Sequence, residues 1–242
     1  MSEAPSERRP LLDRILYWAG WTIFRVLLSL IWRAHYSGAE SVPRKGGCLI
    51  VSNHQSHIDP PLVGTAVISR PMHFIARVGL YKNAVFGWLI THVHTIPIRE
   101  ETGDLAAIKE ALKRIEQGHA VCIFAEGTRS PDGTIQPFKR GVALLLKRSK
   151  CPVIPAAVEG AFDTMPRGRS LPKLKGRVAC FYGKAIEHDE LLADGVDGAL
   201  LRLAKNVEQL RLEARESLRS KSKGAFPPEG VADEMASWLR EN

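Results

Sequence analysis

A histidine and an aspartate five positions apart stand in a polar segment, residues 53–61, directly after the apolar run 48–52. Transfer of an acyl group to a hydroxyl needs a base that takes the proton as the oxygen attacks, and a neutral imidazole suits this near pH 7. A carboxylate on the other ring nitrogen fixes the tautomer and stabilises the imidazolium. We therefore expect His54 to be the general base and Asp59 to be its partner.

The spacing of this pair requires a break in the backbone. On one continuous helix, residues five apart point about 140° away from each other, so a turn must intervene. Pro60 suits the first helical position, which makes Asp59 a helix cap and leaves His54 in the preceding loop. Capping and pairing are compatible if one carboxylate oxygen accepts a backbone amide and the other accepts the imidazole. No nucleophilic serine or cysteine motif accompanies the pair, so we expect direct transfer without an acyl-enzyme.

A metal site is the competing interpretation of the same segment. His54, His57 and Asp59 would need a third or fourth ligand from elsewhere, and the remaining histidines are scattered without metal-type spacing. We therefore expect no metal and no cofactor, and a structural or substrate-lining role for His57.

A second polar segment, residues 124–130, follows the apolar run 120–124. Its Gly127, Thr128 and Arg129 offer backbone amides, a hydroxyl and a forked guanidinium to a phosphate. An ordinary strand–loop turn with a surface arginine explains the segment equally well when it is taken alone. Glu126 either pairs with Arg129 or contacts a substrate hydroxyl.

Apolar runs alternate with helical patterns along the rest of the chain. Spacings of three and four predict helices over residues 105–115, 142–148 and 200–218. The alternation predicts an α/β fold with a mixed, largely parallel sheet covered by helices, in which ligands bind beyond the strand ends. The expected strands are residues 48–52, 73–77, 95–98, 120–124, 153–158 and 177–182.

Charge and cysteine content narrow the class of partner. The net charge of +8 implies an anionic partner, and residues 139–184 hold eleven Lys and Arg against two acidic residues. Few aromatic side chains are interleaved there and no nucleic-acid motif is present, which argues against nucleic acid. The four cysteines lack metal-type spacing, and we expect them to be buried free thiols.

The apolar stretch 15–32 predicts an N-terminal amphipathic, membrane-associated helix. A charge near the centre of a membrane span costs roughly 2.5–3.5 kcal/mol, and Arg25 stands there, so an interfacial helix is favoured over a span. A helix packed on the protein's own core is the alternative. In projection, one stripe holds Arg14, Trp18, Trp21, Arg25, Ser29 and Trp32, and the opposite stripe holds Leu16, Ala19, Ile23, Val26, Leu27 and Leu30.

In order and spacing, the polar motifs together resemble those of the lysophospholipid acyltransferase family, especially its 1-acylglycerol-3-phosphate acyltransferases. Residues 53–59 resemble its His-x4-Asp motif, and residues 86–99 the stretch leading into its second motif. Residues 124–130 with 138–141 resemble the third motif, and residues 153–156 the fourth. Four ordered motifs over about 150 residues are a specific signal.

This resemblance implies transfer of a fatty acyl group from acyl-CoA or acyl carrier protein to the free hydroxyl of a lysophospholipid, in phospholipid biosynthesis. It implies His54 as base and Asp59 as its support. The acceptor's phosphate end would be bound by Arg99, Glu126, Gly127, Thr128 and Arg129. We add Lys139 as a contact to an anionic substrate, for which simple surface charge is the alternative.

The expected organisation is an interfacial helix region (residues 1–37), an acyltransferase domain (38–222) and a C-terminal tail with a short helix (223–242). The expected location is the cytoplasmic face of the cell membrane, on an anionic lipid surface. Two alternatives remain for the function. The same chemistry could act on glycerol-3-phosphate or another lysolipid, or the chain could be a non-catalytic, basic membrane-binding module.

Overall fold

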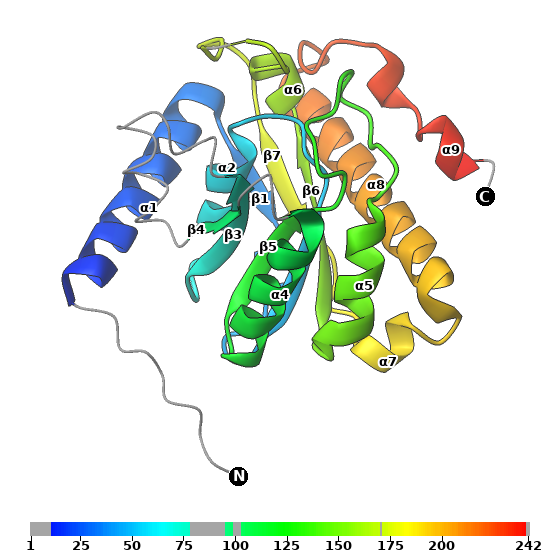
Figure 1. Ribbon diagram of the computed structural model, residues 1–242. Coiled ribbons are helices and arrows are strands. Elements are labelled where there is room, and N and C mark those ends of the chain that lie inside the picture. The colour runs from blue at the N-terminus through cyan, green and yellow to red at the C-terminus, as the bar shows by residue number, and fades with distance from the viewer. Residues whose placement is uncertain (1–10, 78–94, 99–102, 170, 241–242) are drawn as a thin grey trace.

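The computed structural model describes residues 11–77, 95–98, 103–169 and 171–240. Within these ranges, seven strands form one sheet in the order β1-β7-β6-β2-β5-β3-β4 (Figure 1). The strands are β1 (His35–Ser37), β2 (Cys48–Ser52), β3 (Met72–Arg77), β4 (Thr95–Ile98), β5 (Ala120–Phe124), β6 (Val153–Glu159) and β7 (Ala179–Tyr182). Strands β6, β2, β5, β3 and β4 are parallel, and β7 runs antiparallel to β6. The expected mixed, largely parallel α/β sheet is confirmed.

Helices cover both faces of this sheet (Figure 1). Alternate residues of β2 explain how: Ile50 packs with α1 and α2 in one hydrophobic cluster, while Leu49 and Val51 pack with α4, α5 and α8 in another. A strand buried on both faces reads as a continuous apolar run, as this one does. The longer helices are α1 (Leu11–Trp32), α2 (Asp59–Ala66), α4 (Gly103–Glu116), α5 (Arg140–Ser149) and α8 (Gly195–Lys221). The short ones are α6 (Ala161–Thr164), α7 (His188–Leu191), α9 (Ser237–Arg240) and the 3-10 turns η1 (Ala39–Ser41) and η4 (Val231–Asp233).

Among the described strands, the edge strand β1 is the one that the sequence did not predict. Its three residues, His-Tyr-Ser, carry no apolar run, and only β7 pairs with it. Such a short strand is defined by its neighbour and not by its own pattern. The six expected strands are all present, with small shifts where β3 begins at Met72 and β7 at Ala179.

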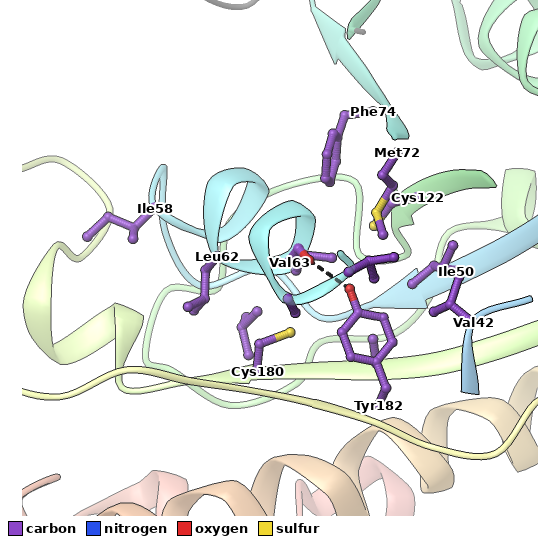
Figure 2. Close-up of a cluster of buried hydrophobic side chains, with 14 of the residues drawn as sticks. Val42, Ile50, Ile58, Leu62, Val63, Met72, Phe74, Cys122, Cys180 and Tyr182 are labelled. Atoms are coloured by element: carbon purple, nitrogen blue, oxygen red, sulfur yellow. Dashed lines mark hydrogen bonds between the residues drawn. The ribbon is translucent and has the colours of Figure 1, made fainter. Parts of the chain in front are cut away.

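A buried cluster beneath α2 fixes the helix that begins at Asp59. Leu62 is fully buried, and the Tyr182 hydroxyl of β7 donates a hydrogen bond of 2.8 Å to the carbonyl of Val63 (Figure 2). Gly64 lets α2 approach the sheet, since a Cβ there would lie 3.2 Å from the Phe74 ring. These contacts pack the middle of α2 closely against the sheet.

Helix α1 turns its arginine–tryptophan stripe toward the protein. Trp21 donates to the carbonyl of Gly64 at 3.3 Å, and Arg25 donates to the carbonyl of Thr65 at 2.8 Å. The Arg25 guanidinium also lies 3.6 Å from the centre of the Tyr36 ring. Trp21 and Arg25 therefore pack on α2 and do not face lipid headgroups, because their donors can satisfy the carbonyls in the last turn of α2. Arg14 and Ser29 of the same stripe are exposed.

The aliphatic stripe of α1 is left outside. Ile23 is 58% exposed and Leu30 is 75% exposed. The segment Arg14–Trp32 is long and apolar enough to cross a membrane by length and composition, and only 17% of it is buried. An exposed aliphatic stripe on a helix of this kind is a feature of membrane association.

The C-terminal residues pack on the main body of the protein. Leu239 of α9 is buried, and it shares a small core with Ala204 and Val207 of α8. The four cysteines are free and buried, as expected. The division into regions at residues 37 and 222 stays a prediction.

Candidate active site

The two polar segments meet because β2 and β5 are neighbouring parallel strands. Ser52 and Phe124, the last residues of these strands, are paired in register. Beyond the strand ends, the amide of Ala125 donates to the carbonyl of Ser52 at 3.0 Å, and the amide of Ser130 donates to the carbonyl of His54 at 2.7 Å. The carboxyl edge of the sheet thus brings together segments that are seventy positions apart in the chain.

His54 and Asp59 form a hydrogen-bonded pair in this edge. Nδ1 of His54 lies 2.8 Å from Oδ2 of Asp59, whose side chain is fully buried while that of His54 is 18% exposed. The imidazole also stacks on Phe124, with ring centres 4.2 Å apart. A proton on Nδ1, held by the carboxylate, leaves the lone pair on Nε2, which is the arrangement a general base needs.

One oxygen of Asp59 holds the whole segment. Besides the imidazole, Oδ2 accepts the backbone amides of Gln55 at 2.6 Å and Ser56 at 2.7 Å, while Oδ1 has no partner among the described residues. Asp59 is the first residue of α2 and Ile58 stands at the cap position. The expectation that Asp59 caps the helix through its second oxygen is therefore wrong. The turn at Ser56 folds the carboxylate back over the amides that precede the helix.

Glu126 fastens the same segment from the other side. It is 1% exposed, and its Oε1 accepts the amide of His54 at 2.7 Å while its Oε2 accepts the amide of Gln136 at 3.0 Å. Burial raises the pKa of Glu126 to about 8, and the two amide hydrogen bonds act against this. Both contacts of the Glu126 carboxylate are to backbone amides, so this carboxylate is not held by a pair with Arg129. Contact of Glu126 with a substrate stays a prediction.

Arg129 supplies an unused positive group beside the pair. Its Nη1 is buried and has no hydrogen-bond partner among the described residues. Burial lowers the pKa of Arg129, and the charge of Arg167 lowers it further. Burial likewise lowers the pKa of His57, and the charge of Arg129 adds to this. A partly buried guanidinium whose buried Nη1 has no partner among the described residues, next to other positive groups, is a place for an anion.

Three of the remaining predicted residues lie on or against the loop that carries Arg129. Gly127 and Thr128 are exposed at the tip of the loop, and Gly127 has a positive φ of 66°. Lys139, exposed at the start of α5, lies against Gly127, since a Cβ there would be 3.0 Å from the lysine Cγ. Arg99 lies outside the described residues.

Sequence reasoning missed a buried connection behind the site. The Gln55 amide donates to the carbonyl of Gly133 at 2.9 Å and to Oε2 of Glu159 at 3.2 Å. Glu159 is in turn bound by Arg211 at 3.2 Å and by Arg215 at 2.6 Å, both from α8. The sequence carried one indication of this network: Arg211 and Arg215 stand beside the apolar face of a predicted helix. A buried charge there needs a partner.

No group of three His, Cys, Asp or Glu side chains suited to a metal ion is found in the part of the chain that the structure describes. The absence of a cofactor stays a prediction.

A largely parallel α/β sheet with a histidine–carboxylate pair at its carboxyl edge defines the class of this protein. The family model described as acyltransferase matches residues 33–159, which is more than half of the chain and contains both polar segments. The chain therefore belongs to the acyltransferase family, whose members transfer acyl groups.

Two curated relatives and one solved structure show which acyltransferases this chain is similar to. The 1-acyl-sn-glycerol-3-phosphate acyltransferase of Bacillus subtilis is 28% identical over 162 residues, which are 67% of this chain and 78% of that protein. A chloroplastic protein of the same name from Brassica napus is 29% identical over 140 residues, 57% of this chain but only 40% of that longer protein. The crystal structure of the 1-acyl-sn-glycerophosphate acyltransferase PlsC from Thermotoga maritima shares the fold, with a TM-score of 0.62, 24% identity and coverage of 82% and 80%.

Proposed function

We propose that this protein is a 1-acylglycerol-3-phosphate O-acyltransferase. It moves a fatty acyl group from the thioester of acyl-CoA or acyl carrier protein to the free hydroxyl of lysophosphatidic acid, giving phosphatidic acid for phospholipid biosynthesis. The observation that carries the proposal is the His54–Asp59 pair, joined at 2.8 Å and partly open to solvent at the edge of the sheet. The names of the curated relatives support the choice of acceptor.

The reaction follows from the orientation of the imidazole. Nε2 of His54 takes the proton of the acceptor hydroxyl as the oxygen attacks the thioester carbonyl carbon. The tetrahedral intermediate then collapses with cleavage of the carbon–sulfur bond, and the imidazolium returns its proton to the leaving thiolate. Asp59 stabilises the imidazolium between these steps. No cofactor takes part in this sequence, and no acyl-enzyme forms.

The acceptor's phosphate has a candidate site at Arg129. Its buried Nη1 lacks a partner, and Gly127, Thr128 and Lys139 stand around the same loop. Arg99 is expected to contribute on the resemblance alone. A guanidinium released from other contacts binds phosphate oxygens with charge-assisted hydrogen bonds.

The site would operate at a membrane surface. Lysophosphatidic acid and the acyl chain partition into a bilayer, while the thioester head group is water-soluble and anionic. The exposed aliphatic stripe of α1 and the net charge of +8 favour an anionic, cytoplasmic membrane face.

The test is thiol release and phosphatidic acid formation by purified protein given acyl-CoA, with and without lysophosphatidic acid. His54→Ala should reduce transfer by about 10²–10⁴-fold without changing the thermal midpoint, since general-base catalysis contributes on this order. His188→Ala is the matched control, because Nδ1 of His188 also lies near a carboxylate, Asp189 at 3.0 Å, but far along the chain from both polar segments. Near-normal turnover by His54→Ala would refute the base assignment.

The same assay separates the acceptors. Glycerol-3-phosphate and lysolipids with larger head groups should be used less well than lysophosphatidic acid. Thiol release that is equal without any acceptor would identify a thioesterase instead, and equal turnover of every acceptor would contradict the assigned specificity.

A further inference from the structure

The loop between α6 and β7 carries two exposed leucines in a basic surrounding. Leu171 is 74% exposed and Leu174 is 75% exposed, more than most large apolar side chains on the described surface. Residues 165–178 contain no acidic side chain. The exposed cations of the loop are Arg167, Arg169, Lys173 and Lys175.

Hydrogen bonds hold this loop in a defined position. The amide of Lys173 donates to the carbonyl of Thr164 at 2.9 Å, and the Trp32 indole donates to the carbonyl of Lys173 at 2.7 Å. The Arg169 guanidinium closes the loop on itself by donating to the carbonyl of Leu171 at 2.9 Å. The two leucines are therefore presented to solvent by an anchored backbone.

The anchors also locate the loop between α1 and the candidate active site. Trp32 ends α1, close to Leu30, which is 75% exposed. At the other end of the loop, the carbonyl of Met165 accepts the Ser56 hydroxyl at 2.8 Å, within the segment that holds His54. In Figure 1 the loop stands beside α6, at the edge of the sheet where the polar segments emerge.

We propose that the described residues 165–169 and 171–177 form a docking loop for an anionic lipid bilayer, in addition to the exposed face of α1. Leu171 and Leu174 insert at the level of the acyl chains, while the four cations lie among the negatively charged head groups. Exposed aliphatic side chains flanked by lysine and arginine are the pattern of membrane-surface elements. The charge complementarity favours acidic lipid, and the aliphatic tips distinguish this loop from a nucleic-acid surface, where stacking aromatics are expected.

The arrangement has a mechanical consequence. If α1 and the loop both contact the bilayer, the carboxyl edge of the sheet is held at the lipid surface by two contacts. With α1 alone it would be held by one. Membrane docking by this loop does not depend on the proposed chemistry, so the two are testable apart.

The experiment is co-sedimentation of the full chain with vesicles of phosphatidylcholine alone and of phosphatidylcholine mixed with phosphatidylglycerol. The double variant Leu171→Ser/Leu174→Ser should bind both kinds of vesicle about tenfold or more weakly, because two leucines no longer leave water. The control Leu105→Ser/Val231→Ser removes two side chains that are 61% and 68% exposed elsewhere, and it should bind like the wild type. Thermal midpoints verify that each variant is folded.

The basic residues are tested separately. Lys173→Gln/Lys175→Gln should bind the mixed vesicles about tenfold or more weakly and the phosphatidylcholine vesicles unchanged, since each cation near an acidic surface contributes on this order. Wild-type binding by the leucine variant overturns the proposal. Loss of binding in the lysine variant alone, with the leucine variant unaffected, also overturns insertion and would show that the loop meets acidic head groups by charge only.

Activity toward a water-soluble, short-chain acceptor separates this inference from the proposed function. The leucine variant should turn over that acceptor at the wild-type rate and lose activity only on vesicle-borne acceptor. An inactive wild type would contradict the proposed function while leaving the vesicle result intact.

Discussion

A single carboxylate oxygen organises the candidate site at the scale of the residue. Oδ2 of Asp59 binds the imidazole of His54 and two backbone amides, so the orientation of the ring and the shape of the loop depend on the same atom. Glu126 also holds this segment, because one of its carboxylate oxygens accepts the His54 amide. The base is thus positioned by two buried acids.

Replacing Glu126 with Gln tests this positioning. The folded protein holds a proton on Glu126 up to a pKa of about 8, far above the usual value of 4.5, so between these values it binds more protons than the unfolded chain. The free energy of unfolding of the wild type should therefore fall, by up to about 1 kcal/mol per pH unit, as pH rises through this window. Glu126→Gln lacks this titration.

Denaturant unfolding of both proteins from pH 5 to pH 8 measures the difference. At pH 5 Glu126→Gln should be less stable by about 1–3 kcal/mol, because one buried amide loses its acceptor. The gap should narrow as pH rises. A constant gap across the series would show that Glu126 is ionised throughout.

At the scale of the element, helix α8 supports the site through buried charge. Arg211 is fully buried, and its guanidinium binds Glu208 at 2.7 Å, Glu159 at 3.2 Å and the carbonyl of Ala232 at 2.7 Å. Glu159 in turn accepts the side chain of Gln55, the neighbour of His54. The helix, the end of β6 and the C-terminal turn therefore share one polar network.

Arg211→Met should lower the free energy of unfolding by about 3–5 kcal/mol, because buried Glu208 loses its ion pair and buried Glu159 keeps only the one with Arg215. Arg202→Met is the matched control on the same helix. Arg202 pairs with Glu190 at 2.6 Å but is 42% exposed, so its loss should cost no more than about 1 kcal/mol. Urea unfolding of both variants measures the two losses in free energy of unfolding. Equal losses would contradict a structural role for the buried network.

At the scale of the whole molecule, positive charge and exposed apolar surface occur together. The chain carries a net charge of +8, and the aliphatic stripe of α1 and the loop of residues 165–177 are joined through Trp32 and Lys173. Apolar insertion is insensitive to salt, whereas attraction to acidic lipid is screened by it. The two contributions are therefore separable by ionic strength.

Affinity for vesicles containing phosphatidylglycerol should fall about tenfold or more when salt is raised from about 0.01 M to about 0.15 M, since the screening length shortens from about 30 Å to about 8 Å. Affinity for phosphatidylcholine vesicles, measured by the same sedimentation assay, should change little. A salt-independent affinity for the acidic vesicles would show that the basic surface does not take part.

The sequence by itself determined the α/β class, six of the strands and the two polar segments that follow β2 and β5. These are local properties: apolar runs and helical spacing are set by the faces that each element buries. It also predicted the His54–Asp59 pair, from the residue types that a general base and its partner require and from the resemblance to a family motif.

Only the tertiary structure decided which partner each face meets. The arginine–tryptophan stripe of α1 lies inward because α2 offers it open carbonyls, and Glu126 meets backbone amides because β5 lies beside β2. Gln55 and Glu159 are 104 positions apart, so no local pattern links them. The periodicity of a sequence shows which face of a helix or strand must be buried. The residues that cover this face come from distant parts of the chain, and only tertiary packing determines which they are.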